Sequence, residues 1–469
     1  MANVATANDD LWGHPKGLYI LFFTELWERF SYYGMRAILV LFMISSATGD
    51  NPGFGWDEGD AISLYGTYTM LVYVMSIAGG LIADKLWGQK KTVFIGGLLL
   101  CLGHGILAVE ALWAFYAGLA LIILGVGGLK PNISTMVGGL YPQGDLRRDK
   151  GFTIFYIGIN IGAFLSALIV GGVAEVYGWH YGFGLAGIGM LVGQAVFMWG
   201  RKFLKGVGEA TKDLSPKEAE AKKKPLTAIE VDRMKVMGIS FLLIIIFWGA
   251  FEQAGGLMNI YTAQKTDLSL SFTIPYIGDA IPASWFQSVN AFFIITLGVP
   301  IASFWVWWKT RGRESSSIFK MAIGVIIMGV GFLFMSAASI QFEAEGSSAM
   351  YWLVLAYLFH TIGELCASPV ALSYITKLAP LKYASLMMGV YFAATGVGNK
   401  VAGLVGEWSQ SAGELEIFTG IAIFCTAIGL LVIALLKPLK RLAHGAEDTQ
   451  EGSHNEEAEG FEIADKPSI

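Results

Sequence analysis

Long runs of apolar residues alternate with short polar segments along almost the whole chain. Clear examples are residues 93–107, 239–249 and 417–436. A helix needs about 20 mostly apolar residues to cross the ~30 Å hydrocarbon core of a bilayer. These runs are continuous and do not alternate with polar positions, and a helix satisfies its own backbone in lipid. The pattern therefore predicts membrane-spanning helices and disfavours a β-barrel.

The apolar pattern predicts twelve spans in total. Their ranges are 17–45, 59–84, 92–110, 112–138, 151–176, 181–203, 234–262, 286–309, 318–340, 350–378, 382–407 and 415–437. Composition agrees, because 54% of the residues are hydrophobic and only 15% are charged, whereas soluble domains carry about 25% charged residues. We expect an all-α, multi-pass integral protein of the cytoplasmic (inner) cell membrane.

The charged residues between the spans separate by sign into two groups. One set of loops is basic and contains Lys85, Lys90, Lys91, Arg147, Arg148, Lys150, Lys309, Arg311, Arg313, Lys320, Lys377 and Lys382. The opposite loops hold mostly acidic residues, such as Asp57, Glu58, Glu343 and Glu414. Because Lys and Arg accumulate on the cytoplasmic side, both termini are predicted to be cytoplasmic.

The longest polar interruption, residues 205–231, divides the spans into six and six. We therefore expect an N-terminal cytoplasmic segment, a six-helix bundle, a cytoplasmic linker, a second six-helix bundle and an acidic, disordered C-terminal tail. Their predicted ranges are 1–16, 17–203, 204–233, 234–437 and 438–469. Two six-helix halves around a site near the bilayer midplane are the layout of the major facilitator fold.

The first span carries charges that are costly in a bilayer, at least ~2.5 kcal/mol each. Glu25, Glu28, Arg29, Tyr32, Tyr33 and Arg36 all fall on one stripe of a 3.6-residue helix. Such a stripe indicates a hydrated face, although ion pairs that only lock helices together are the alternative. Four later spans contain further charges, namely Lys130, Glu252, Glu364 and Lys400. Carboxylates near basic groups in a cavity can gain or lose protons, which suits a proton-coupled carrier. Lys400 lies near the end of its helix, so its side chain can extend along the helix and place the ammonium group in water.

Several other function classes find no support in the sequence. Cys101, Cys366 and Cys425 are far apart inside apolar runs, so no disulfide framework is expected. The six histidines show no metal-ligand spacing, and no nucleophile with a base indicates an enzyme. We expect no cofactor other than protons and no nucleic-acid partner. A channel is a further alternative, but two unlike halves joined by a linker favour alternating access.

Five segments resemble signature motifs of the proton-dependent oligopeptide transporter (POT) family of the major facilitator superfamily. ELWERFSYY at 25–33 resembles its ExxERFxYY motif, and GGLIADKLWG at 79–88 resembles its element between spans 2 and 3. GLKPN at 128–132, FTIFYIGINIGAF at 152–164 and GELCASP at 363–369 are similar to its motifs in spans 4, 5 and 10. These matches occur in the family's order.

The resemblance implies a function and a role for individual residues. It implies a proton-coupled symporter that imports di- and tripeptides by alternating access, acting as a monomer. Arg36 and Lys130 would hold the peptide carboxylate, and Glu364 its ammonium group. The remaining implied substrate-binding residues are Tyr33, Tyr68, Asn160 and Asn290 for the backbone, with Trp248, Ser368 and Tyr391 for side chains. Glu25, Glu28, Arg29 and Glu252, the last near Arg36, would couple the proton.

The sequence also departs from the family pattern. Many bacterial relatives have two extra helices between the halves, for which residues 205–231 are too short and polar. Tyr391 stands where Trp is common, and Gly66 follows Tyr65 where some relatives have a histidine. Because the family includes carriers of nitrate and other small solutes, an anion carrier of the same fold is the alternative. The presence of both Lys130 and Glu364 favours peptides.

Overall fold

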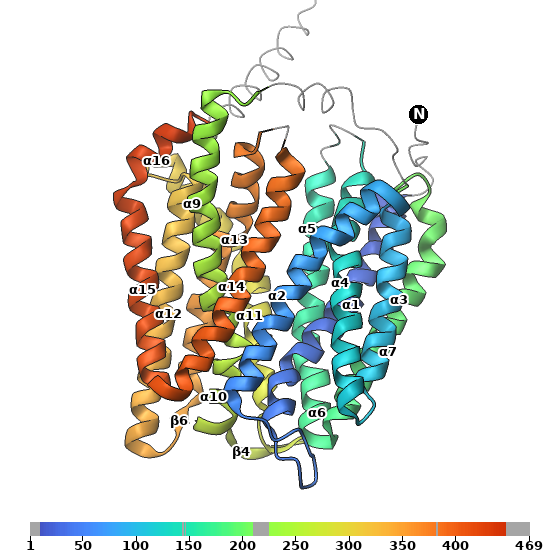
Figure 1. Ribbon diagram of the computed structural model, residues 1–469, viewed down its shortest axis with the longest axis vertical. Coiled ribbons are helices and arrows are strands. Elements are labelled where there is room, and N and C mark those ends of the chain that lie inside the picture. The colour runs from blue at the N-terminus through green and yellow to red at the C-terminus, as the bar shows by residue number, and fades with distance from the viewer. Residues whose placement is uncertain (1–9, 143–144, 146, 210–224, 381–382, 447–469) are drawn as a thin grey trace, which may run out of the picture.

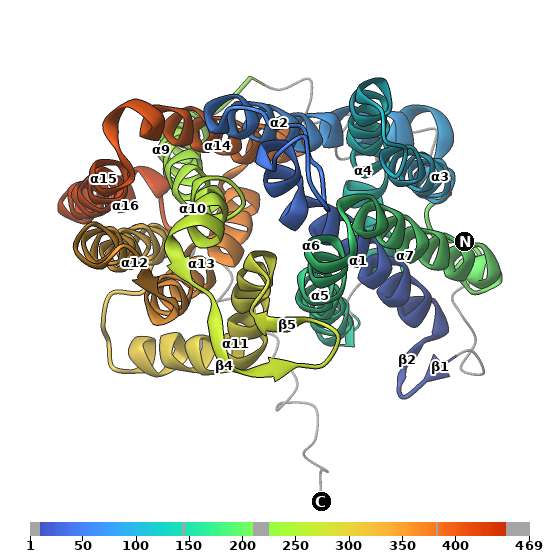
Figure 2. The same ribbon diagram turned by 90° about the horizontal axis from the view of Figure 1, so that it is seen from below.

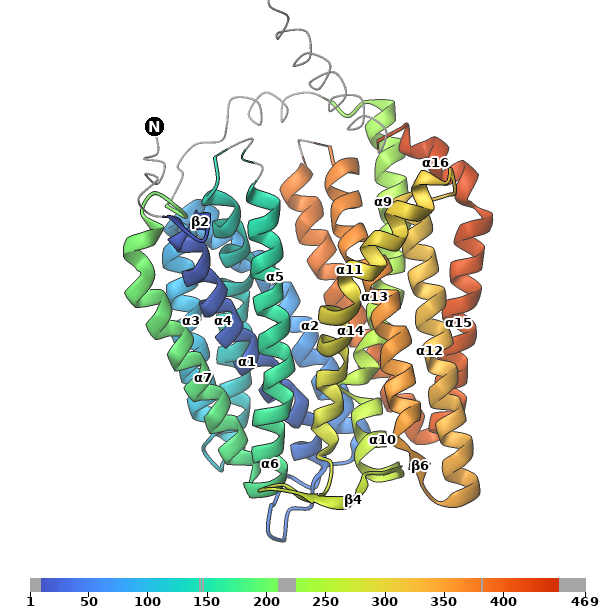
Figure 3. The same cartoon turned by 180° about the vertical axis from the view of Figure 1, so that it is seen from behind.

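Two groups of long helices stand side by side and follow each other in the chain. The computed structural model describes residues 10–142, 145, 147–209, 225–380 and 383–446. The first bundle consists of α1 (Lys16–Ile44), α2 (Glu58–Ile82), α3 (Gln89–Leu107), α4 (Leu112–Gly139), α5 (Arg147–Ser166), α6 (Gly172–Tyr177) and α7 (Trp179–Gly200). Figures 1 and 3 show these helices in blue to green, beside the helices of the second half, which run from yellow-green to red.

The second bundle contains the remaining long helices. They are α9 (Ala228–Phe251), α10 (Leu257–Lys265), α11 (Gln287–Thr310), α12 (Ser317–Glu345), α13 (Met350–Leu378), α14 (Ala384–Ala412), α15 (Glu414–Ala434) and α16 (Leu436–Ala443). Figure 2 views the molecule along the helices, with α2 beside α14 and α5 beside α11 where the bundles meet.

Ten of the helical segments in the described residues are long and apolar enough to cross a membrane. The other two predicted spans correspond to α1 and α14, each 29 residues long. The charged stripe of α1 lowers its hydropathy, and α14 carries Lys400 and Glu407. A protein of mostly membrane-crossing helices is therefore confirmed, whereas the crossings by α1 and α14 and the cytoplasmic termini stay predictions.

Two predicted spans are interrupted between two α-helices. The span at 151–176 is α5 followed by a π-helical turn, η3 (Ala167–Gly171), and then α6. The span at 234–262 is interrupted by a 3-10 turn, η5 (Glu252–Ala254), between α9 and α10. Because Gly255 and Gly256 follow this turn, the chain can change direction there at little steric cost. Both interruptions lie beside the interface between the bundles.

Helices extend into both the predicted linker and the predicted tail. Within 204–233, α9 begins at Ala228, because Thr227 and Glu230 form a reciprocal capping box. Within 438–469, α16 continues to Ala443, where the prediction of a disordered tail from residue 438 is wrong. Leu439 and Ala443 are buried, and Arg233 donates to the carbonyl oxygen of Ala443 at 3.1 Å. The predicted disorder of residues 447–469 lies outside the described residues.

Helices α2 and α4 approach so closely that glycine is required at their contact. A Cβ atom added at Gly79 would lie 2.0 Å from the carbonyl oxygen of Gly127. Pro131 in α4 cannot donate to that same carbonyl, which therefore faces α2 without its helical partner. The amide of Asn132 then donates to the carbonyl oxygens of Gly79 and Gly128 at 3.2 and 2.8 Å. Small residues thus allow the close contact that membrane helices use.

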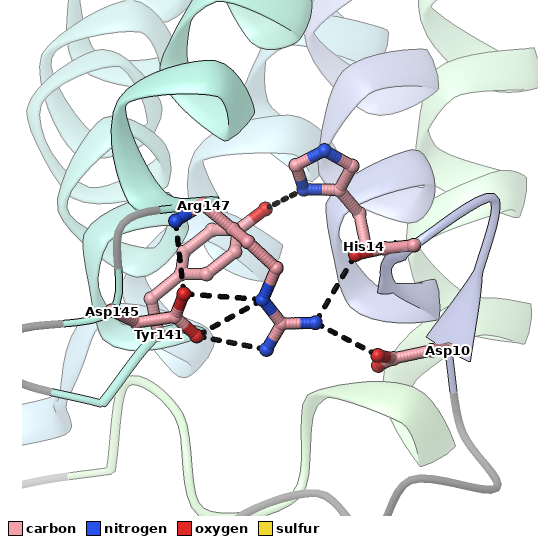
Figure 4. A network of polar contacts seen from close by, with 6 residues as sticks. Asp10, His14, Tyr141, Asp145 and Arg147 are labelled. Atoms are coloured by element: carbon pink, nitrogen blue, oxygen red, sulfur yellow. Dashed lines mark hydrogen bonds and ion pairs between the residues drawn. The ribbon is translucent and has the colours of Figure 1, made fainter.

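One end of the molecule carries the basic loops and is the predicted cytoplasmic end. There the short strands β1 (Asp10–Leu11) and β2 (His14–Pro15) lie against the connection between α4 and α5. Figure 4 shows Arg147 bonded to Asp10 at 2.9 Å and to Asp145 at 2.8 Å, and His14 bonded to the hydroxyl of Tyr141 at 2.8 Å. The segment before α1 is therefore fastened to its own bundle.

The opposite end is the predicted extracellular end, called the outer end below. Its connections contain short strands that the sequence did not predict. They are β3 (Thr266–Asp267), which pairs with β6 (Ser348–Ala349), and β4 (Ser269–Ile274), which pairs with β5 (Gly278–Ala280). A 3-10 turn, η6 (Ala283–Phe286), then leads into α11. Figures 1 and 3 show these strands and α10 across the outer end, below both bundles.

Candidate functional site

A cavity lies between the two bundles and is lined by residues from both. Its wall includes Tyr33, Arg36, Tyr73, Tyr156, Asn160, Ser166, Trp248, Phe251, Glu252, Gln287, Asn290, Tyr357 and Glu364. The first six come from helices α1, α2 and α5, and the others come from η5 and helices α9, α11 and α13. Charged, amide and aromatic groups thus converge between two halves of the chain, which suits a polar solute with apolar parts.

Between the cavity residues of α1 and its predicted cytoplasmic end, the helix contains a compact cluster of three charges. The guanidinium Nε of Arg29 lies 2.7 Å from a carboxylate oxygen of Glu25 and 2.9 Å from one of Glu28. All three side chains are at most 3% exposed. The second oxygen of each carboxylate, Glu25 Oε2 and Glu28 Oε1, has no hydrogen-bond partner among the described residues. One cation therefore serves two buried carboxylates, so the cluster has room for a proton.

Lys130 of α4 points its ammonium group at an aromatic ring. Its Nζ lies 3.8 Å from the ring centroid of Tyr73, in a cation–π contact. Tyr73 lines the cavity, whereas Lys130 does not reach its wall. In this conformation the ring of Tyr73 therefore lies between the ammonium group of Lys130 and the cavity.

At the outer side of the cavity an ion pair joins the two bundles. Arg36 Nη1 of α1 lies 3.2 Å from Glu252 Oε1, and the hydroxyl of Tyr65 donates to Glu252 Oε2 at 3.4 Å. Arg36 is 8% and Glu252 2% exposed. Glu252 sits at the break between α9 and α10, which turns its side chain toward the first bundle. The structure thus places together the two residues that the sequence analysis expected near each other.

Glu364 of α13 has a different environment, with neutral partners only. The amide nitrogen of Asn290 donates to Glu364 Oε2 at 2.9 Å and to the hydroxyl oxygen of Thr361 at 3.0 Å. In the part of the chain that the structure describes, Glu364 forms no ion pair with a basic side chain, although it lines the cavity. A carboxylate in this position can accept an external cation.

The other expected substrate-binding residues fall into two groups. Asn160, whose amide donates to the carbonyl oxygen of Tyr156 at 2.9 Å, and Trp248 line the cavity. Ser368 and Tyr391 line a smaller, mostly apolar pocket that shares Trp248 with the cavity. Tyr68 lies in neither wall and is 2% exposed, with no hydrogen-bond partner for its hydroxyl among the described residues. The expected roles of all these residues stay predictions.

Several cavity-lining residues were not singled out from the sequence, among them Tyr73, Tyr156, Gln287 and Tyr357. An aromatic residue in an apolar helix ordinarily indicates packing, so the tyrosines gave no separate signal. Tyr156 lies within the segment 152–164 that resembles a family motif, and this was the available indication. Gln287 is the first residue of α11, next to an outer connection that the spans did not define.

Comparison with known proteins identifies the family of this chain. A family model described as the POT family matches residues 90–223 and 217–416. The chain is 33% identical over 501 residues to a di-/tripeptide transporter of Lactococcus lactis subsp. cremoris, covering 94% of this chain and 99% of the relative. It is 36% identical over 489 residues to the uncharacterized transporter YclF of Bacillus subtilis, covering 92% and 96%. The chain belongs to the POT family.

Solved structures of POT proteins share its fold. A peptide transporter POT in complex with sulfate superposes with a TM-score of 0.84 at 34% identity, covering 92% of this chain and 96% of the other. A POT family transporter in complex with 5-aminolevulinic acid gives a TM-score of 0.83 at 28% identity, covering 92% and 98%. The predicted family and the helical major facilitator fold are thereby confirmed. The protein is a multi-pass membrane transporter of the POT family.

Proposed function

We propose that this protein imports di- and tripeptides together with protons by alternating access of the central cavity. The observation that carries the proposal is Glu364, a carboxylate in the cavity wall that has only neutral partners among the described residues. Arg36 lies in the wall contributed by the other bundle. A short peptide is a zwitterion, so its two ends fit a cavity with a carboxylate in one half and a guanidinium in the other.

The arrangement also explains a preference for short peptides. The ammonium group would pair with Glu364, and the carboxylate would pair with Arg36. Lys130, behind the ring of Tyr73, would add positive charge after that ring moves. Between the charged ends, Asn160 and Asn290 offer amide groups to the peptide backbone, and the pocket of Ser368 and Tyr391 accepts a side chain. The fixed spacing of the charges limits the length of the substrate.

Proton coupling follows because two carboxylates compete for one cation at each of two places. A peptide carboxylate that binds Arg36 competes with Glu252 for the guanidinium at 3.2 Å. A buried carboxylate that loses its cation becomes neutral by taking a proton, because an unpaired buried charge is costly. Arg29, shared between Glu25 and Glu28, offers a second place where a proton can replace a cation. Movement of the proton inward gains about 2.3 kcal/mol per 100 mV.

The names of relatives support the substrate class. The Lactococcus lactis relative is a di-/tripeptide transporter, and a relative from Yersinia enterocolitica, 33% identical over 507 residues, is a peptide transporter. The alternative of an anion carrier does not explain a cavity carboxylate that forms no ion pair within the described residues. We propose that the protein works as a monomer in the lipid bilayer, is not an enzyme, and uses protons without another cofactor.

The test is uptake by purified protein in liposomes. A dipeptide should accumulate when the outside is more acidic than the inside, and a proton-conducting ionophore should abolish the accumulation. An N-acetylated dipeptide and nitrate, each added in excess, should compete poorly. Accumulation that the ionophore leaves unchanged would contradict proton coupling, and strong competition by nitrate would favour the anion carrier.

A further inference from the structure

Several sets of contacts hold the outer ends of the bundles together, including hydrogen bonds from Asn259 to the carbonyl oxygen of Ala37 and from Gln264 and Gln410 to the carboxylate of Glu58. Two others lie next to residues of the cavity wall. The first is the ion pair between Arg36 and Glu252 described above. The second, which we call the α5–α11 seam, runs along a different pair of helices. On one side it comprises Phe164, Leu168 and Glu175, and on the other side Ala283, Ser284, Trp285 and Ser288. Figure 2 shows α5 and α6 beside α11 at this place.

Glu175 makes the most specific contact of the seam. Its Oε2 accepts a hydrogen bond from the backbone N–H of Ala283 at 2.9 Å, and its Oε1 accepts one from the N–H of Ser284 at 2.8 Å. These donors lie in the turn η6 that leads into α11, where backbone N–H groups lack helical acceptors. The carboxylate of one bundle thus caps the entry into a helix of the other bundle, where a negative charge is favoured.

Two further hydrogen bonds continue the seam toward the cavity. The indole Nε1 of Trp285 donates to the carbonyl oxygen of Leu168 at 2.9 Å, within the π-helical turn η3. The hydroxyl of Ser288 donates to the carbonyl oxygen of Phe164 at 2.8 Å. Such π turns are often found at functional positions in helices. Here the turn lies between α5 and α6, so that backbone carbonyls of α5 and η3 meet side chains of α11.

The backbone of η3 lies against the side chain of Ser284 in η6. A Cβ atom added at Gly171 would lie 2.1 Å from the Ser284 hydroxyl oxygen and 2.8 Å from its Cβ atom. A side chain at position 171 would therefore displace Ser284, so the absence of a side chain at Gly171 favours the observed register of η6 against η3. The position of η6 against η3 also affects the cavity, because Gln287 and Asn290 follow η6 on α11 and line the cavity wall. Since Asn290 holds Glu364 at 2.9 Å, the seam positions the partner of the cavity carboxylate.

We propose that Glu175 is a second latch of the outer gate, acting as a positioning residue that holds α11 against α5 while the outer side is closed. The proposal rests on the proposed alternating access, because only a protein whose bundles separate at the outer end must break these contacts. Opening to the outside then requires release of both the Arg36–Glu252 pair and the Glu175 cap. Release of the cap would also free α11, and with it Asn290, from its position beside Glu364.

The experiment measures the outer gate directly, without peptide or proton gradient. Spin labels on cysteines at Glu110 and Ala344, exposed at the outer ends of the two bundles, report the distance between them in a variant whose three native cysteines are replaced. Glu175→Ala removes two charge-assisted hydrogen bonds. It should raise the ratio of the long-distance, outward-open population to the closed population at least tenfold.

Asp57→Ala is the matched control. Asp57 also accepts a hydrogen bond from a backbone N–H at a helix start, that of Gly59 at 2.9 Å, but both residues belong to the first bundle. Its removal should leave the distance distribution unchanged. Trp285→Phe, which deletes one neutral hydrogen bond and keeps a ring, should shift the ratio by about two- to tenfold and gives an answer even if Glu175→Ala fails to fold.

The outcomes separate this proposal from the proposed function. Unchanged distances in Glu175→Ala or, where that variant is unfolded, in Trp285→Phe would overturn the latch, whatever the uptake assay shows. An equal shift in Asp57→Ala would overturn it as well, because general loosening of the outer end would then explain the result. A failure of peptide uptake in the unaltered protein would instead contradict the proposed substrate and leave the distance measurement valid.

Discussion

The two bundles place charge beside the cavity in opposite ways. In the first bundle, Arg29 is shared between Glu25 and Glu28 at 2.7 and 2.9 Å, and all three residues belong to one helix. In the second bundle, Glu364 has Asn290 as a hydrogen-bond partner and, among the described residues, no cation. The first arrangement pairs two carboxylates with one cation inside a single helix, whereas the second leaves a carboxylate available to a ligand.

The difference separates two tasks that a coupled carrier must perform. A cluster in which carboxylates outnumber the cation can take up a proton without any substrate. A lone carboxylate in the cavity wall can instead pair with the substrate's ammonium group. The Arg36–Glu252 pair, with one residue from each bundle, connects the two tasks at the outer side. Variants that affect folding, binding and coupling separately can therefore test whether the two arrangements perform different tasks.

The largest expected effect is the loss of stability in Arg29→Ala. Removal of the cation leaves Glu25 and Glu28 buried next to each other, and loss of one partner from a buried ion pair costs about 3–5 kcal/mol. The apparent melting temperature in detergent should fall sharply. Arg311→Ala, at an exposed arginine of a basic loop, is the control and should melt like the unaltered protein. A small shift in Arg29→Ala would mean that the cluster is hydrated and not structural.

Glu364→Gln should show the reverse pattern, with weak binding and a stable fold. Glutamine keeps an oxygen that can accept from Asn290, so the melting temperature should hardly change. Loss of the charge should weaken the apparent affinity for dipeptides with a free N-terminus about 10- to 100-fold. An N-acetylated dipeptide should bind both proteins equally weakly. If the variant lost affinity for blocked and free peptides alike, Glu364 would not be the ammonium partner.

Glu28→Gln should separate coupling from movement of the carrier. Without this carboxylate, Arg29 keeps Glu25, so the fold should persist, but one proton site is removed. Uptake driven by a proton gradient should fall at least tenfold, while counterflow exchange of labelled for unlabelled dipeptide should fall less than about threefold. Equal losses in the two assays would show that Glu28 supports the transport cycle in general and not its coupling to protons.

Features within one helix could be predicted from the local sequence pattern, whereas contacts between distant helices could not. The stripe from Glu25 to Arg36 was predictable because helical periodicity fixes which residues of a single helix share a face. The division into two bundles followed from apolar runs and loop charges. The meeting of Arg36 with Glu252 and the role of Glu364 came only from family resemblance, because no local pattern reports which faces of distant helices meet.

Other features could not be predicted because they depend on register between helices. The break that begins at Glu252 lies inside a run that was predicted as one span, and the π turn at 167–171 has no distinctive composition. Glu175 was not singled out, since a carboxylate near the end of a span ordinarily faces water. Its importance appears only when η6 of the other bundle lies opposite it. The contacts between the bundles, more than the elements within each bundle, thus became known only from the structure.

The smallest expected effect concerns one exposed ion pair in each bundle at the predicted cytoplasmic end. Hydrogen bonds from the guanidinium and backbone N–H of Arg147 hold the pKa of Asp145 below its ordinary value. In the second bundle, burial raises the pKa of Glu314, but hydrogen bonds from Lys440 and Ser316 outweigh it and bring the pKa to about 2. A carboxyl whose pKa is lower in the folded protein contributes stability above its unfolded pKa and loses it as pH falls.

Both pairs should therefore matter at neutral pH and lose their effect in acid. The melting temperature of Asp145→Asn should lie slightly below that of the unaltered protein at pH 7, and the difference should shrink as the pH falls below about 4, near the unfolded pKa of an aspartate. Glu314→Gln should behave alike, with its difference disappearing only near pH 2. Each shift should be small, because exposed ion pairs contribute little. A difference that grew toward acid pH would mean that these carboxyls are protonated in the folded protein, and the comparison of the two bundles would then rest on their buried charges alone.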